Sequence, residues 1–294
     1  PVSTFLDLLA GGLTTGAIFG IFAACLAVWF RVSNILNLAV GDFAMLGAVG
    51  VAQLAEDAHV NLVLSILIVL LCVGAVGWAF DRLVLHFAFD RGERAHGITS
   101  IFFYTFGLSL VIEGIALVAF GTDLFAAPAL WKGPALHVLN FHIQRPGVLV
   151  LALAIVSGAA LWAYLTFTVS GRAASACGES AVGSRIVGIR TATFRRWVFV
   201  FTGLLAALFG IIVSPITGFV YNSGPTISLV GVLAAGFAGF HRPGRAVVIG
   251  LILGIIEAML GGYVSTQYND VILYGLMFVV ILGRPSLLGI TATA

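Results

Sequence analysis

The stretch "PGVLVLALAIVSGAALWAYLTFTV", residues 146–169, carries no charged side chain. An apolar run of about 20 residues is long enough to cross the hydrocarbon core of a bilayer as a helix. Its residues do not alternate between polar and apolar, as the strands of a membrane barrel do. Since backbone groups in lipid must find hydrogen-bond partners within their own segment, this stretch predicts a transmembrane helix.

The whole chain has the same character. Of its 294 residues, 61% are hydrophobic and 9% are charged, whereas about a quarter of the residues of a soluble protein are charged. We therefore expect an all-α, polytopic helical membrane protein that forms a single transmembrane domain over residues 1–294.

The apolar runs predict eight or nine transmembrane helices. The segment 226–240 is short and rich in glycine, so it is a candidate for a broken or re-entrant helix. The segment 34–55 starts with the polar stretch "SNILNLAVGDF" (33–43) and is a candidate for a partly irregular one. The predicted crossings lie near residues 4–29, 34–55, 61–85, 98–120, 147–168, 197–220, 226–240, 246–262 and 270–283.

Basic residues are distributed unevenly between the predicted loops. If the loop 171–196 is cytoplasmic, 12 of the 14 basic residues lie on its side of the membrane, and Lys132 and Arg145 lie on the other. Short cytoplasmic loops are enriched in lysine and arginine. We therefore expect the N-terminus outside and, with nine crossings, the C-terminus inside.

The sequence offers little catalytic chemistry. Lys132 is the single lysine and is not part of a G-x-x-x-x-G-K-[ST] phosphate loop, so we expect no ATP hydrolysis by that device. We also expect no metal site and no enzyme activity in this chain. Asp42, Glu113 and Glu257 fall at predicted membrane depth, where helix-to-helix hydrogen bonding is favoured over a place on a pathway.

Glycines recur within the predicted helices. Gly12, Gly16 and Gly20 follow one another at a spacing of four. This spacing lets two helix backbones approach closely, so tight packing is favoured over a pathway lined by glycine.

The segment "GRAASACGESAVGSRIVGIRTATFRR", residues 171–196, separates two apolar runs and carries five arginines. Its spacing predicts a short helix at the membrane surface that stops at Gly188. Such a helix could be held to anionic headgroups by its arginines, or it could be a docking element for a cytosolic partner. The spacing alone leaves these two interpretations open.

Three regions together resemble the branched-chain amino-acid ABC transporter permeases, and specifically the shorter of their two permease subunits. They are the segment from Gly171 through the following helix, the N-terminal "GLTTGAIFGIFAACLAVWFRVSNILNLAVGDFAMLGA", and the C-terminal "GVLAAGFAGFHRPGRAVVIGLILGIIEAMLGGYVSTQYNDVILYGLMFVVILGRPSLLG". Urea-type permeases are close relatives of that family. The chain departs from the family pattern at Val40, where a histidine is usual, and in "FAGFHRPGRA" (237–246), which adds His241, Arg242 and Arg245.

The resemblance implies an ATP-binding-cassette importer fold in a bacterial or archaeal cytoplasmic membrane. It implies import of a branched-chain or related amino acid by alternating access. The partners would be a second, homologous permease subunit, two cytosolic ATPase subunits that bind ATP and Mg, an extracytoplasmic substrate-binding protein and membrane lipid, but no nucleic acid. This chain would hold no cofactor itself. Coupling to the ATPase would fall on Glu179, Arg185, Gly188 and Ile189.

For the substrate pathway, the polar start of the second span is the first candidate, because its amides can bind a polar solute. Hydrogen bonds that merely join helices are the alternative. The glycines of the seventh span are the second candidate. The residues concerned are Ser33, Asn34, Asn37, Gly41 and Asp42, and then Gly231, Gly236 and Gly239. An ATP-independent channel or secondary carrier is the rival function, although it leaves the arginine-rich loop without a role.

Overall fold

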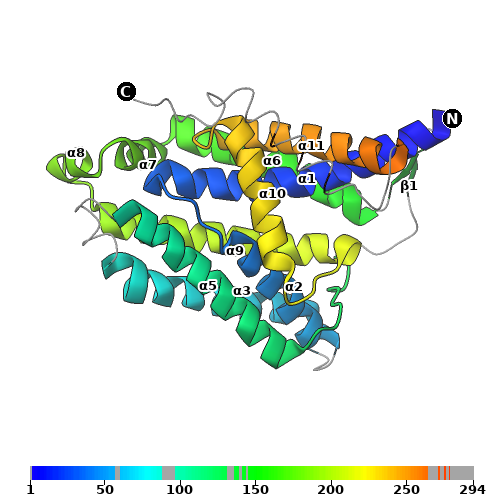
Figure 1. Ribbon diagram of the computed structural model, residues 1–294, viewed down its shortest axis with the longest axis horizontal. Coiled ribbons are helices and arrows are strands. Elements are labelled where there is room, and N and C mark those ends of the chain that lie inside the picture. The colour runs from blue at the N-terminus through cyan, green and yellow to red at the C-terminus, as the bar shows by residue number, and fades with distance from the viewer. Residues whose placement is uncertain are drawn as a thin grey trace.

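The computed structural model describes residues 2–56, 60–87, 97–130, 136–138, 141–143 and 145–263, together with residues 271, 275 and 278. The described chain forms a bundle of helices, with one short β-hairpin among the connections (Figure 1). The expected all-α, polytopic architecture is confirmed.

In the part of the chain that the structure describes, six helices are long and apolar enough to cross a membrane. Two further apolar helices are shorter, and two small polar helices follow residue 168. The long helices are α1 (Val2–Ser33), α3 (Leu62–Phe80) with its π-helical extension η1 (Asp81–Leu85), α5 (Gly97–Phe120), α6 (Arg145–Phe167), α9 (Thr191–Thr217) and α11 (Pro243–Tyr263); the shorter ones are α2 (Val40–Glu56), α10 (Ser223–Ala238), α7 (Val169–Glu179) and α8 (Ala181–Ile186), and the hairpin pairs β1 (Leu136–Val138) with β2 (Phe141–Ile143).

Eight of the predicted crossings correspond to these helices. The irregular start of the second one is confirmed, because α2 begins only at Val40. The seventh is an uninterrupted helix, α10, rather than a broken one. The last helix before it, α9, begins at Thr191 and not at 197, so Arg195 and Arg196 belong to a helix. The predicted crossing at 270–283 lies outside the described residues except for three positions.

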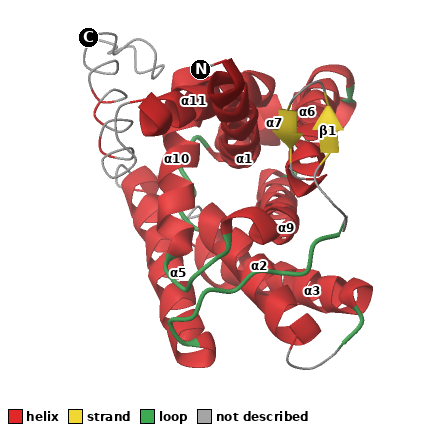
Figure 2. Ribbon diagram, turned by 90° about the vertical axis from the view of Figure 1, so that its right-hand side faces the viewer, coloured by secondary structure: helices red, strands yellow, loops and turns green. Residues whose placement is uncertain are grey.

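Of the six long helices, α1 and α9 are the most buried. The most apolar windows of α1 and α9 are 72% and 67% buried, against 22–33% for the other four long spans. Figure 2, which looks along the bundle, shows α1 beside α11 on one side and α3 on the far side of α9. The remaining long helices therefore present most of their apolar surface outward, as expected of helices in contact with lipid.

Helix α9 is joined to three neighbours by one aromatic side chain. The ring of Phe199 is fully buried. It makes edge contacts with Trp29 of α1 (ring centroids 5.0 Å apart) and Phe43 of α2 (5.9 Å), and it stacks on Phe80 of α3 (6.0 Å). Aromatic rings at these separations attract each other beyond simple burial of area.

Helices α1 and α11 touch through their backbones. A Cβ atom on Gly16 would lie 2.7 Å from the Cα of Leu251, and one on Gly20 would lie 2.8 Å from the carbonyl oxygen of Val247. From the other side, a Cβ on Gly254 would lie 2.2 Å from the Cα of Gly16. The prediction that these glycines serve tight packing is confirmed.

The bundle has two distinct ends (Figure 1). One carries α7 and α8 and is called the α7–α8 end below. The other carries the start of α1 and the β-hairpin and is called the N-terminal end. The chain reverses direction between them at each long helix, so residues far apart in sequence meet at both ends.

Candidate functional site

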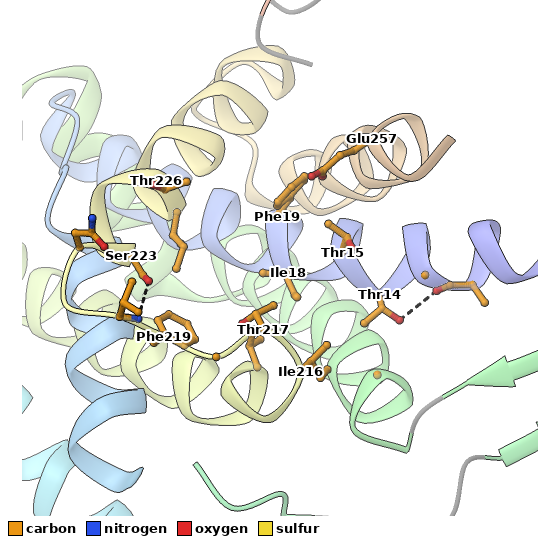
Figure 3. A pocket seen from close by; sticks show the side chains of 18 of the residues that line it. Thr14, Thr15, Ile18, Phe19, Ile216, Thr217, Phe219, Ser223, Thr226 and Glu257 are labelled. Atoms are coloured by element: carbon orange, nitrogen blue, oxygen red, sulfur yellow. Dashed lines mark hydrogen bonds between the residues drawn. The ribbon is translucent and has the colours of Figure 1, made fainter. Parts of the chain in front are cut away.

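A cavity of about 690 Å³ opens in the half of the bundle nearer the N-terminal end. It is lined by the first half of α1, Gly147 of α6, the end of α9, the connection from α9 to α10, the start of α10, and Glu257 of α11 (Figure 3). No single helix encloses it. The polar side chains in its lining are Asp7, Thr14, Thr15, Thr217, Asn222, Ser223, Thr226 and Glu257.

The wall on the α9–α10 side is held in place by a connection from another part of the chain. Helix α9 ends at Thr217, and Gly218 turns the backbone with φ +64°, a conformation that favours glycine. Phe219 then pairs with Phe125 through two backbone hydrogen bonds of 2.8 Å. The hydroxyl of Ser223 accepts a hydrogen bond from the Val220 N–H at 3.0 Å. The loop that borders the cavity is therefore fixed at three consecutive points.

The cavity combines two kinds of surface. Ile18, Phe19, Ile216 and Ile227 supply apolar wall, while hydroxyl groups and the carboxylate of Glu257 supply polar contacts. Binding pockets of this kind use apolar area for affinity and a few placed polar groups for orientation. The arrangement is suited to a small solute with one apolar part and one polar or cationic part.

The polar residues predicted to line a pathway lie elsewhere, around the break between α1 and α2. Ser33 donates to the carbonyl oxygen of Trp29 (2.9 Å), and the Asn37 side chain accepts from the Ala39 N–H (3.0 Å). Both side chains therefore shape the backbone turn. In the part of the chain that the structure describes, neither residue lines the cavity.

Gly41 and Asp42 stand where α2 meets α10. The hydroxyl of Ser228 accepts from the Gly41 N–H (2.8 Å) and donates to the Leu38 carbonyl oxygen (2.5 Å). A Cβ on Gly224 would lie 2.1 Å from a carboxylate oxygen of Asp42, which is fully buried, with Ser109 and Glu113 of α5 nearby. These contacts join helices, which is the alternative that the sequence left open.

The glycines of α10 also have packing and turning roles. A Cβ on Gly231 would lie 2.8 Å from Leu26 of α1. Gly239 ends the helix with φ +81°, and its N–H donates to the carbonyl oxygen of Gly236 at 2.9 Å. As with the break between α1 and α2, the described contacts do not place these glycines on the cavity wall.

The segment 171–196 belongs to α7, α8 and the start of α9 rather than to one short helix. Thr168 caps α7 and Ser180 caps α8, each through its hydroxyl. Glu179 ends α7 and is exposed, Arg185 is exposed on α8, and Gly188 turns the chain with φ +85°. Ile189 packs partly against the core of this chain instead of projecting from it.

Sequence reasoning missed the apolar tip of this segment. Ile186 and Val187 are 81% and 74% exposed at the end of α8. Two exposed aliphatic side chains beside Arg185 form a contact surface that a partner could cover. Ile189 is near in sequence and equally apolar, so the sequence alone does not tell which of Ile186 and Ile189 points outward.

A network that we call the Arg31 cluster attaches α7 to the rest of the bundle. It consists of Arg31, Asn34, Ser175, Gly178 and His241. Arg31 donates to the Ser175 hydroxyl (2.9 Å) and to the His241 carbonyl oxygen (2.8 Å). The Asn34 amide donates to the Gly178 carbonyl oxygen, and its oxygen lies 3.0 Å from Nε2 of His241.

The Arg31 cluster therefore joins three parts of the fold: the end of α1, helix α7 and the connection between α10 and α11. Gly178 is essential to this approach, since a Cβ there would lie 2.0 Å from the Arg31 carbonyl oxygen. A displacement of α7 would be passed to α1 and α11, the two helices that contribute Thr14, Thr15 and Glu257 to the cavity.

The cavity residues could not be found from the sequence. Thr14, Ser223 and Glu257 belong to separate helices, and no local pattern indicates that they lie around one cavity. Glu257 was identified as an acid at membrane depth, without a site. Among the described residues, no group of three or more His, Cys, Asp or Glu side chains is placed to hold a metal ion.

Comparison with known proteins identifies the family. The family model described as "Branched-chain amino acid transport system / permease component" matches residues 8–282. The high-affinity branched-chain amino acid transport system permease protein LivH of Escherichia coli is 24% identical over 295 residues, covering 96% of this chain and 94% of the relative. The corresponding protein BraD of Pseudomonas aeruginosa is 23% identical with the same coverage.

A further relative carries a different description. The autoinducer 2 import system permease protein LsrC of Yersinia enterocolitica is 31% identical over 238 residues, which is 81% of this chain and 60% of the relative. No solved structure gave a significant match. The match of the family model from residue 8 to residue 282, over a bundle of membrane-spanning helices, shows that the chain belongs to the branched-chain amino acid transport permease family.

Proposed function

We propose that this chain is the translocation subunit of an ATP-driven importer for a branched-chain or related amino acid. The permease relatives that span nearly the whole chain support the substrate class. The cavity supports it as well, since it pairs aliphatic and aromatic wall with the carboxylate of Glu257. An amino acid with an apolar side chain presents an ammonium group and a hydrocarbon part to such a surface.

ATP hydrolysis, in this proposal, belongs to two separate cytosolic ATPase subunits that hold ATP and Mg. The α7–α8 end faces the cytoplasm, and the N-terminal end faces an extracytoplasmic substrate-binding protein. The supporting observation is the arginine content of the α7–α8 end, which includes Arg31, Arg172, Arg185, Arg196 and Arg242. Short cytoplasmic loops of membrane proteins carry an excess of arginine and lysine. A second permease subunit completes the pathway.

The observation that carries the mechanism is the attachment of α7 through the Arg31 cluster. ATPase subunits that close against α8 would push on Ile186 and Val187, which are exposed. Because α7 is bound to α1 and to the α10–α11 connection, the push would shift the helices around the cavity. Rigid elements that move against one another in this way are the usual basis of alternating access.

Co-expression with the neighbouring transporter subunits tests the proposal. Glu179→Lys and Ile186→Asp are expected to lower ATP-dependent uptake in vesicles about tenfold or more and to reduce recovery of ATPase subunits. Glu179→Lys reverses a charge on the proposed ATPase contact, and Ile186→Asp places a charge on its apolar part. Asp123→Lys, an exposed charge reversal at the N-terminal end, is the matched control. Full coupling in both α7–α8 variants would exclude this surface as the ATPase contact.

The rival function, an ATP-independent channel or carrier, gives the opposite result. It predicts that the chain reconstituted alone moves the solute without nucleotide. Uptake that persists without ATPase subunits would therefore reject the importer.

A further inference from the structure

A second cavity, of about 610 Å³, lies at the α7–α8 end between α6 and the start of α11. We call it the α6–α11 groove. It is separate from the cavity at the N-terminal end, since the two share no lining residue. The proposed transport cycle gives it no role.

Three arginines stand at the mouth of the α6–α11 groove: Arg31, Arg242 and Arg245. Arg242 and Arg245 are exposed. Within the described ranges, the side chain of neither arginine forms a hydrogen bond or an ion pair. The described residues that line the groove include no aspartate or glutamate, although Glu179 acts on Arg31 from outside it. The mouth therefore carries positive charge that the chain itself leaves largely uncompensated.

The rest of the groove is apolar and faces outward from the bundle. Ile155 and Trp162 of α6 and Val248 of α11 line it, and they are 53%, 54% and 54% exposed. Gly158 and Gly244 let α6 and α11 pack closely along the groove. A Cβ on Gly158 would contact Val247, and a Cβ on Gly244 would contact Trp162. Both helices are membrane spans, so this wall lies against the acyl region of the bilayer.

The length of the groove agrees with a lipid chain entering from one leaflet. It runs along α11 from Arg242 to Leu251, which at 1.5 Å per residue is about 13 Å. One leaflet contributes roughly 15 Å of hydrocarbon. The arginines are thus at headgroup level when the apolar wall is at acyl level.

We propose that the α6–α11 groove binds an anionic phospholipid of the phosphatidylglycerol class in the leaflet at the α7–α8 end. Its phosphate lies between Arg242 and Arg245, and one acyl chain lies along Trp162 and Val248. Basic pockets between transmembrane helices bind anionic headgroups in this way. The first turn of α11 adds N–H groups that point toward the same place.

Bound lipid would also bear on the transport machinery. Arg31 belongs both to the groove and to the Arg31 cluster, where it donates to Ser175 and His241. A phosphate bound at the mouth would lie near the guanidinium of Arg31, which attaches α7 to α1. The lipid is therefore expected to stiffen this attachment.

The test compares lipids on the purified, delipidated transporter with its co-purifying subunits. Phosphatidylglycerol added in detergent is expected to raise the thermal unfolding midpoint by about 5 °C, as for any ligand that binds only the folded state. Phosphatidylcholine and inorganic phosphate are the comparison probes. Native mass spectrometry counts the retained phosphatidylglycerol. The double variant Arg242→Gln/Arg245→Gln is expected to bind it about tenfold or more weakly.

Two controls decide between occupants. Arg172→Gln/Arg190→Gln removes two exposed charges at the same end that do not line the groove, and it should retain phosphatidylglycerol fully. Trp162→Ala should weaken the binding without changing the arginines. Equal binding by the groove variant and the wild type would overturn the proposal. So would an equal shift from inorganic phosphate, or a Val248→Cys crosslink to the second permease subunit, which would mean that a protein covers the groove.

Discussion

Single residues in this chain hold helices together by polar contacts inside an apolar bundle. Asp81, at the π-helical end of α3, is 1% exposed and pairs with Nε of Arg196 on α9 at 2.6 Å. Arg196→Met is expected to destabilise the protein by about 3 kcal/mol, because it leaves a buried carboxylate without its counter-charge. Chemical denaturation in detergent measures this loss.

The Asp81→Asn/Arg196→Met double variant separates the pair from the general effect of substitution. It should regain a large part of the loss, since no charge is then left alone. If the two single effects simply add, the ion pair contributes nothing of its own.

His241 makes the Arg31 cluster sensitive to acid. Partial burial and then the charge of Arg31 lower the pKa of this imidazole, and Glu179 acts in the opposite direction. The folded state therefore takes up a proton less readily than the unfolded chain, and the stability that neutral His241 provides is lost as the pH falls below about 6.5. We expect the unfolding midpoint to drop between pH 7.5 and pH 5.5. The drop should shrink in His241→Asn; an unchanged drop would assign it to other groups.

The sequence located the polar residues of the α1–α2 break but not what they do. Asn34 was a pathway candidate because an amide near membrane depth can bind a solute. In the fold its partners are Gly178 and His241, which are 144 and 207 positions away. Such partners follow from tertiary packing, which the local sequence does not encode.

At the scale of helices, the contact between α1 and α11 depends on glycine backbones. Gly16→Leu is expected to disrupt assembly, because even a Cβ at Gly16 would lie 2.7 Å from the backbone of Leu251 and the helices must separate. Gly107→Leu on α5, where nothing lies within 4 Å, is the matched control. Recovery of monodisperse protein after detergent extraction measures the effect. Equal recovery of both variants would show that α1 and α11 do not need this approach.

The sequence predicted the helices better than it predicted the contacts of single residues or the cavities. Runs of apolar residues predicted the long spans, and the glycine spacing of α1 predicted close packing. Starts of helices were less certain, because the five arginines of 171–196 indicated a loop. Arg196 instead lies within α9, where Asp81 neutralises it. A charged side chain in an apolar helix is tolerated when an oppositely charged partner lies beside it. The local sequence around Arg196 does not reveal that partner, Asp81.

At the scale of the whole molecule, two cavities of similar size occupy opposite ends of the bundle, and α1, α6 and α11 contribute lining residues to both. Neither was predicted, since each is assembled from helices that include ones far apart in the sequence. The Arg31 cluster lies between the α7–α8 surface and the helices that border the first cavity. The fold therefore provides a physical connection from the proposed ATPase contact to the proposed solute site.

The solute site itself gives the last prediction. Glu257 lines the cavity from α11, and its carboxylate is suited to an ammonium ion. Glu257→Gln keeps the size of the side chain and removes the charge. We expect it to lower ATP-dependent uptake of an amino acid about tenfold or more, because hydrogen bonds to charged groups contribute roughly 1.5–3 kcal/mol. The loss should appear mainly as a higher KM, while basal ATPase activity and subunit recovery stay normal. Asp123→Asn, at the same end and not in the lining, should leave uptake unchanged. A normal KM in Glu257→Gln would place the amino group of the solute elsewhere.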